Sequence, residues 1–278
     1  MTSRNSSWKS DFAAGASGPE TEEIKRTTEF GNRRGPIPLL PAGKDYLWGG
    51  RRLRDDFSKD IPLTPLAETW ECSTHPDGLS LLAEDPDKTL HELLQENPWM
   101  FGTHPAKSMP EAVEKGELPV LIKFIDAAAD LSVQVHPDDA YAREHENGQL
   151  GKSEMWYVVD AAPGAKLVYG FSHDMDRERV REAAQNGTLE KHLQRVPIRK
   201  DDVFFIPAGT VHAIGGGSLI AEVQESSNLT YRLYDYHRIG KDGKERPLHL
   251  EKALQVARLS AAEEPRQPMR VLNYRPGF

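Results

Sequence analysis

The chain has 278 residues, of which 38% are hydrophobic and 28% charged, and its formal net charge is −8. This composition is ordinary for a soluble globular protein, and the length allows one elaborated domain or two small ones. No apolar run approaches the roughly 20 residues that a membrane-spanning helix needs. The acidic balance argues against a nucleic-acid partner, because phosphate backbones are bound through basic surfaces.

The cysteine content indicates a reducing compartment. Cys72 is the single cysteine, so the chain cannot form an internal disulfide or a thiolate metal cluster. The first residues contain no continuous apolar segment of the kind that a secretory signal requires. We therefore expect a cytoplasmic protein.

The composition and the hydrophobic periodicity of the sequence change near Pro36. Residues 1–35 are rich in Ser, Gly, Thr and charge and show no periodicity, so we expect a flexible N-terminal tail. From Pro36 onward, short apolar or alternating runs broken by Pro and Gly are interspersed with helical stretches, a pattern typical of a β-rich α+β fold. We place one domain at residues 36–265.

Helical spacing and end signals predict five helices. The first is residues 87–94, with Asp87 as N-cap and Pro98 beyond its end. The others, in chain order, are residues 138–146, 175–187, 189–193 and 248–259. Strand-like runs bounded by turn residues lie at 120–125, 131–135, 154–159, 166–170, 202–206, 218–223 and 230–234. Seven short strands favour a barrel or a sandwich.

The strand at 131–135 carries a polar face that leads into a histidine. Alternation places Ser132, Gln134 and His136 on one face and the apolar residues on the other. For one isolated histidine, a solvated surface is the commoner explanation. Further ligand-type residues downstream, however, occur in similar settings.

Two downstream segments complete a possible metal site. Lys152 and Glu154 share a face ahead of an aromatic strand, and the strand that ends at Ile206 runs through a tight turn to His212. Two neutral imidazoles and one carboxylate suit zinc or another borderline divalent ion, and the amide oxygen of Gln134 can add a fourth ligand. The ligands are spread over nearly eighty residues, so their spacing alone is a moderate signal.

These segments also resemble a known family. The stretch from Asp201 to His212, which includes PAGTVH, is similar to the second cupin motif, and Gln134-Val-His136 with a delayed Glu154 is similar to a split first motif. The strings LIKFIDAAADLSVQVHPDDAYA, GKSEMWYVV, IPAGTVHAIGGG and QESSNLTYRLYDY resemble the central motifs of type I mannose-6-phosphate isomerases of the short bacterial class. DYLWGG and AETWECSTHPDG resemble their N-terminal motifs, so the likeness runs from about Pro36 to Leu259.

The resemblance implies a mainly β fold, a cupin or jelly-roll β-barrel with inserted and flanking helices, and one Zn²⁺ per chain. The implied zinc ligands are Gln134, His136, Glu154 and His212. The implied substrate is a sugar phosphate. The implied reaction is the aldose-ketose isomerisation that interconverts mannose 6-phosphate and fructose 6-phosphate through an enediolate. The resemblance leaves the oligomeric state unknown.

The resemblance also assigns residues around the metal. Arg232 matches the family's catalytic arginine, and Lys152, a second catalytic candidate, also matches a position that lines the substrate pocket. The candidate substrate-binding residues are Lys123, Ser132, His75 and, as an additional candidate for the same pocket, Glu222.

Several simpler explanations stay open at this stage. His75 precedes a turn and can simply cap it, and Arg232 can be a structural partner of Asp235. The proton carrier is open between Glu222, Lys152 and a zinc-linked water, because an arginine stays protonated.

Two other functions and one question of domain structure also remain. An iron-dependent cupin oxygenase and a sugar-sensing cupin without turnover both fit the same ligands. Members of the family usually continue into a C-terminal β unit, and we expect residues 266–278 to be the start of such a unit, cut short here.

Overall fold

The structure is a computed structural model that describes residues 35–240 and 242–267. The chain divides into two units, Met1–Gly35 and Pro36–Phe278, and every element named below belongs to the second. The expected tail, apart from Gly35, and the expected C-terminal β unit from residue 268 onward lie outside the described residues. Among those described, no helix is both long and apolar enough to cross a membrane.

Antiparallel strands dominate the second unit. Within the described residues they form sheets of six, five and three strands, in the orders β11-β8-β13-β6-β3-β2, β10-β9-β12-β7-β14 and β1-β4-β5. Their bounds are β1 Leu39–Leu40, β2 Ala42–Lys44, β3 Glu68–Cys72, β4 Leu81–Leu82, β5 Asp85–Thr89, β6 Val120–Ala127, β7 Val133–Val135, β8 Glu154–Ala161, β9 Lys166–Phe171, β10 Leu193–Pro197, β11 Val203–Ile206, β12 His212–Ile214, β13 Ser218–Glu225 and β14 Tyr231–Tyr234.

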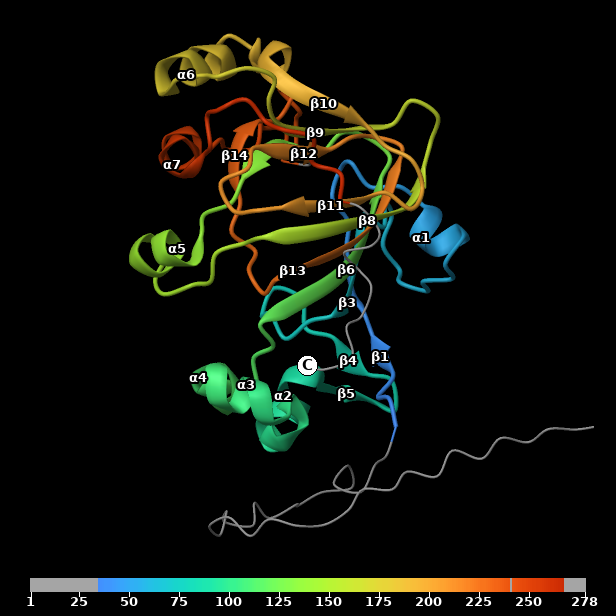
Figure 1. Ribbon diagram of the computed structural model, residues 1–278. Coiled ribbons are helices and arrows are strands. Elements are labelled where there is room, and N and C mark those ends of the chain that lie inside the picture. The colour runs from blue at the N-terminus through green and yellow to red at the C-terminus, as the bar shows by residue number, and fades with distance from the viewer. Residues whose placement is uncertain (1–34, 241, 268–278) are drawn as a thin grey trace, which may run out of the picture. The chain divides into compact units, whose positions relative to one another are not determined.

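Helices lie at both ends of this unit. Figure 1 shows α6 and α7 beside the five-stranded sheet, and α2, α3 and α4 gathered at the opposite end near β4 and β5. The helices are α1 Arg52–Asp55, α2 Leu90–Glu96, α3 Thr103–Ser108, α4 Pro110–Lys115, α5 Asp139–His145, α6 Arg177–Gln185 and α7 Leu250–Val256, with 3₁₀ turns η1 Pro98–Phe101 and η2 Leu189–His192.

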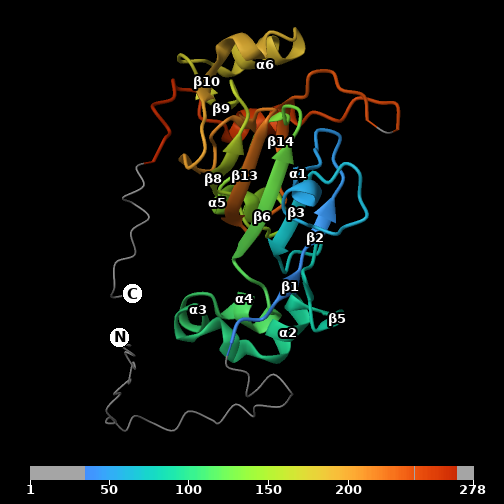
Figure 2. The ribbon, with the colours of Figure 1, turned by 90° about the vertical axis from the view of Figure 1, so that its right-hand side faces the viewer.

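The alternation of side chains along the strands gives each large sheet two different faces. The inner faces contribute Ile125, Trp156, Phe204 and Ile214 to one buried cluster. The outer face of the five-stranded sheet packs Val133, Val168 and Ala213 against α6 and α7 in a second cluster. Figure 2 shows β8, β13, β6 and β3 side by side in the six-stranded sheet. Polar residues that alternate with this inner core are therefore held between the sheets.

The prediction of a β-rich α+β fold is confirmed, and all seven predicted strands are present. The predicted closed barrel is not formed by the described strands, which stay in separate hydrogen-bonded sheets that pack through their inner faces. The helices predicted near 138–146, 175–187 and 248–259 are present with shorter bounds, and residues 189–192 form a 3₁₀ turn.

The predicted N-cap at Asp87 is wrong. Asp87 lies in β5, and α2 begins after Thr89, whose side chain accepts a hydrogen bond from the Glu92 backbone while the Glu92 side chain accepts one from the Thr89 backbone. This reciprocal capping box satisfies two backbone donors at the start of the helix, whereas a cap at Asp87 would satisfy one.

Candidate active site

Three ligand-type side chains meet between the two large sheets. His136 follows β7, Glu154 begins β8 and His212 begins β12, and one ligand atom of each lies within 4.8 Å of the others. All three are at most 2% exposed. The turn before His212 is tied directly to His136, because the Gly209 backbone N–H donates to the His136 carbonyl at 2.8 Å. Gly209 has a φ of 84°, which a side chain would strain.

Hydrogen bonds fix which nitrogen of each imidazole is available. The Nδ1 atoms of His136 and His212 lie 2.7 and 2.8 Å from the carbonyl oxygens of Leu229 and Thr210. Because a carbonyl only accepts, each Nδ1 must carry the proton and donate it. In the neutral ring, Nε2 then presents its lone pair, as in histidines that ligate metals.

Both Nε2 atoms point at the Glu154 carboxylate, at 3.1 Å for His136 and 3.6 Å for His212. Burial, the largest effect, together with the nearby Lys152 lowers the pKa of His136 to about 3, and burial also lowers the pKa of His212. The rings are therefore neutral near pH 7, and lone pairs face a negative carboxylate. His136 Nε2 and Glu154 Oε2 have no hydrogen-bond partner among the described residues. A cation between them satisfies both, so the site fits a divalent metal ion.

Gln134 stands beside this group, as the metal hypothesis requires. Its amide nitrogen lies 3.5 Å from His212 Nε2, and its amide oxygen accepts from the Ser132 hydroxyl at 3.4 Å. A half-turn of the amide plane exchanges oxygen and nitrogen and directs the oxygen toward the metal-binding group.

Two buried lysines lie among three buried carboxylates next to the metal-binding group. Lys152 Nζ lies 2.8 Å from Glu154 Oε1, and Lys123 Nζ lies 3.0 Å from Glu222 Oε2 and 3.6 Å from Glu68 Oε2. Burial raises the pKa of Glu154, but the charge of Lys152, the largest effect in the opposite direction, helps to hold that pKa well below its usual range. Burial and the Glu154 charge raise the pKa of Glu222 to about 7. The two carboxylates are thus driven apart in proton affinity, a pattern common at catalytic sites.

Arg232 lies next to the metal-binding group through strand register. It pairs with Gln134 across β14 and β7, so the two side chains are cross-strand neighbours. Its guanidinium donates to Ser132 Oγ at 3.3 Å and to the Pro247 carbonyl at 2.8 Å. No carboxylate pairs with it among the described residues, and Asp235 binds Arg238 and Arg246 instead. The structural pairing of Arg232 with Asp235 is therefore wrong.

A cavity of about 280 Å³ opens onto these groups. Gln134, Glu154, Lys123, Lys152, Ser132, Glu222 and Arg232, seven of the residues selected from the sequence, line it. His136 and His212 do not line it, but their Nε2 atoms lie 3.1 and 3.6 Å from the carboxylate of Glu154, which does. The structure thus brings together residues from 123 to 232 in one place.

Apart from His136 and His212, which face Glu154, His75 is the one selected residue that does not line the cavity. Its Nδ1 accepts a hydrogen bond from the Asp77 backbone at 3.1 Å, which is the turn-capping role left open above. The same turn reaches the cavity indirectly, because Asn228, a lining residue, donates to Asp77 Oδ2 at 2.7 Å. The role of His75 in substrate binding therefore stays a prediction.

Sequence reasoning missed Arg246 and Glu68, which both line the cavity. Arg246 lies in an irregular segment, and it reaches the cavity because Asp235 holds it through Nε and Nη2 at 2.7 and 2.6 Å. Asp235 can be identified from the sequence as an acidic residue, but its pairing with Arg246, eleven residues away, cannot be predicted from it.

Comparison with known proteins places the chain in a family. Residues 37–160 match the model of the phosphomannose isomerase type I catalytic domain. A probable mannose-6-phosphate isomerase of Bacillus subtilis, GmuF, is 41% identical over 80% of this chain and 68% of its own length. The chain belongs to the type I phosphomannose isomerase family.

Two further members of the family show a similar degree of likeness to this chain. The mannose-6-phosphate isomerase of Streptococcus mutans is 42% identical over 80% of this chain and 67% of its own length. The crystal structure of the Bacillus subtilis mannose 6-phosphate isomerase superposes with a TM-score of 0.75 at 38% identity, over 83% of this chain and 71% of that one.

Replacing both His136 and His212 by Ala should remove most of the divalent metal from the purified protein. The double variant deletes both nitrogen ligands and leaves one carboxylate and one amide, which do not hold a borderline ion tightly. Metal content per chain, measured by elemental analysis after dialysis, checks this. His75→Ala is the matched control and should keep wild-type metal content. Full occupancy in the double variant would place the metal elsewhere.

Proposed function

We propose that this chain is a zinc-dependent aldose-ketose isomerase that interconverts mannose 6-phosphate and fructose 6-phosphate. The observation that carries the proposal is the pair of buried imidazoles whose Nε2 lone pairs face Glu154 beside a cavity lined by arginine and lysine. The names of the similar proteins support mannose 6-phosphate as the aldose substrate. A ligand set of two imidazoles, one carboxylate and one amide supports zinc. The single cysteine supports a cytoplasmic location.

The proposed ligands are His136, His212, Glu154 and Gln134. A divalent ion held there supplies Lewis acidity to the oxygens of a neighbouring sugar. Isomerisation moves a proton between C1 and C2, and the enediolate that forms carries negative charge on two oxygens. The remaining task of this chain is to stabilise that charge and to move the proton.

Arg232 stabilises the developing charge in this proposal. It is a neighbour of Gln134 and therefore close to the metal-binding group. Its Nε and Nη1 atoms are held by Ser132 and Pro247, which leaves Nη2 without a hydrogen bond among the described residues. A planar guanidinium fixed in this way meets two adjacent oxygens without reorganising during the reaction.

Glu222 is the proton carrier that the geometry favours among the three that the sequence leaves open. Its Oε1 accepts from Trp156 Nε1 at 2.7 Å, and its Oε2 lies 3.0 Å from the ammonium group of Lys123. Its pKa, raised to about 7, lets it take and return a proton near neutral pH. Lys152 is engaged by Glu154 at 2.8 Å and contributes fixed positive charge.

The phosphate group of the substrate belongs near Arg246. Lys123 and Lys152 are each neutralised by buried carboxylates, so they have little charge to offer a phosphate. Asp235, by contrast, is shared by Arg238 and Arg246, which leaves excess positive charge at the cavity wall. The sugar would then lie with its carbonyl end at the metal-binding group and its phosphate toward Arg246.

A coupled assay for fructose 6-phosphate formed from mannose 6-phosphate tests the proposed function. The zinc-loaded protein should turn over, a chelator should abolish the activity, and added zinc should restore it. Oxygen consumption without isomerisation would instead favour a cupin oxygenase. Tight sugar-phosphate binding without any turnover would favour a sensor.

Glu222→Gln should lower kcat by about 100-fold or more, because it removes the proposed proton carrier but keeps the shape of the side chain. The matched control is Glu68→Gln, which removes another carboxylate beside Lys123 and should lower kcat less than tenfold. In the wild type, kcat/KM should rise with pH as Glu222 loses its proton, and this ascending limb should vanish in the Gln variant. Equal rates for the two variants would remove Glu222 from proton transfer.

Arg232 and Arg246 should separate catalysis from binding. Arg232→Ala should lower kcat by about two orders of magnitude, on the order of 3 kcal/mol, with zinc content intact. Arg232→Lys should restore part of the rate, because it keeps the charge but loses the planar fork. Arg246→Ala should mainly raise KM. Measurement of kcat, KM, zinc content and melting temperature on each preparation distinguishes these effects from unfolding, and a normal kcat in Arg232→Ala would contradict its role.

A further inference from the structure

A second cavity, of about 220 Å³, lies on the outer face of the five-stranded sheet. Strand register builds it: Arg195 of β10 pairs with Val168 of β9, and Val168 pairs with Ala213 of β12. Directly opposed residues project from the same face of a sheet, so these three side chains form a row. Arg195 provides charge at one end of the row, and Val168 and Ala213 provide an apolar floor.

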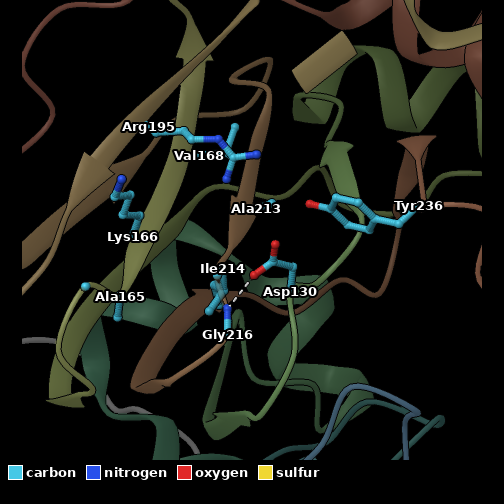
Figure 3. A pocket seen from close by; sticks show the side chains of 11 residues that line it. Asp130, Ala165, Lys166, Val168, Arg195, Ala213, Ile214, Gly216 and Tyr236 are labelled. Carbon is cyan, nitrogen blue, oxygen red and sulfur yellow. Dashed lines mark hydrogen bonds between the residues drawn. The ribbon is translucent and has the colours of Figure 1, made fainter. Parts of the chain in front are cut away.

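The far wall comes from segments that are distant in sequence. Tyr236 follows β14 with a φ of 57°, a left-handed conformation that costs a non-glycine residue about 1 kcal/mol or more. Its ring is packed by Tyr234, 5.1 Å away between centroids, and by the Arg238 guanidinium at 5.2 Å. The surrounding contacts therefore hold Tyr236 in this conformation. In Figure 3 its hydroxyl is turned toward the same space as the Arg195 guanidinium.

Asp130 completes the polar lining. Its Oδ1 accepts from the Gly216 backbone N–H at 2.6 Å, which leaves Oδ2 available. The adjacent Gly215 has no room for a side chain, since a Cβ there would lie 2.1 Å from the Lys166 carbonyl oxygen. The turn after β12 therefore packs closely against β9. This packing and the hydrogen bond from Gly216 fix the position of Asp130 in the cavity wall.

Several polar side chains that line this cavity have hydrogen-bond donors without a partner among the described residues. Arg195 forms an ion pair with Glu190 through Nη2 at 2.6 Å, but both side chains are more than a third exposed, so solvent screens the pair, and Nε and Nη1 remain for a ligand. Tyr236 has no hydrogen bond through its hydroxyl, and Lys166 has no ion pair, among the described residues. Burial raises the pKa of Tyr236, so its hydroxyl keeps a proton to donate at neutral pH. The cavity thus offers two cations for an anion, and a carboxylate and a phenol for hydroxyl groups.

We propose that this cavity is a second small-molecule site, specific for a hydroxylated phosphate ester such as a sugar or polyol phosphate. Arg195 and Lys166 meet the phosphate, Asp130 and Tyr236 meet hydroxyl groups, and the carbon chain lies on Val168 and Ala213. The volume is below the roughly 300 Å³ at which pockets for drug-sized ligands begin, which suits a small ligand. The site is distinct from the proposed catalytic cavity: β12 separates the two, and Ile214 alone lines both.

Titration calorimetry with sorbitol 6-phosphate tests this site. Sorbitol 6-phosphate has no carbonyl group and cannot be isomerised, so binding is measured without turnover. The zinc-loaded full chain should bind two equivalents. Arg195→Gln should bind one, and Tyr236→Phe should bind the second equivalent about fivefold or more weakly, because one hydrogen bond is lost. Arg179→Gln, an exposed arginine of α6 outside the cavity, is the matched control and should bind two.

The outcome separates this site from the catalytic one. Arg195→Gln should turn over mannose 6-phosphate at the wild-type rate, so loss of one equivalent with full turnover supports the second site. A single equivalent in both the wild type and Arg195→Gln, with turnover intact, would overturn it. If the chain shows no isomerase activity and still binds an equivalent that Arg195→Gln removes, the second site stands and the proposed function fails.

Discussion

The buried carboxylate of Glu154, faced by two imidazole lone pairs, is the constraint on which the rest of the site depends. Moving an ion from water into a protein interior costs several kcal/mol unless opposite charge and hydrogen bonds compensate. Lys152 compensates in part, at 2.8 Å from Oε1. The imidazoles cannot, because Leu229 and Thr210 hold their protons on the far nitrogen. The two lone pairs and the carboxylate therefore need a positive charge between them. Because the strands already hold these groups in place, the site is preorganised to fit a metal ion.

The pairing of antiparallel strands explains how ligands that are far apart in the sequence come together at one site. Alternation along β7 sends Gln134 to the inner face and Val133 and Val135 to the outer core, and the antiparallel partners β12 and β14 bring His212 and Arg232 alongside Gln134. Each residue is therefore fixed by a strand whose other face packs into a core. A ligand that is packed from behind loses little further freedom on binding, which favours a preorganised site.

The sequence predicted what depends on local pattern and failed where the outcome depends on tertiary pairing. Alternation found seven strands, but β12 has only three residues and β10 ends at Pro197, so neither gave a strand signal. The cap at Asp87 failed because Thr89 and Glu92 form a reciprocal pair. The ligand set came from short motifs, whereas Arg246 depends on Asp235, and the second cavity depends on register between β9, β10 and β12. No local window contains that information.

The charges around the cavity bear on the class of substrate. Three buried carboxylates, Glu68, Glu154 and Glu222, face two buried ammonium groups, Lys123 and Lys152. That group alone is negative and would repel a phosphate ester. A divalent ion at the imidazoles reverses the sign, and Arg232, which has no carboxylate partner among the described residues, adds to the positive side. In the proposed function, metal loading and affinity for an anionic substrate would therefore be linked by the same electrostatics, and a bound ion would help to attract the sugar phosphate as well as to promote its chemistry.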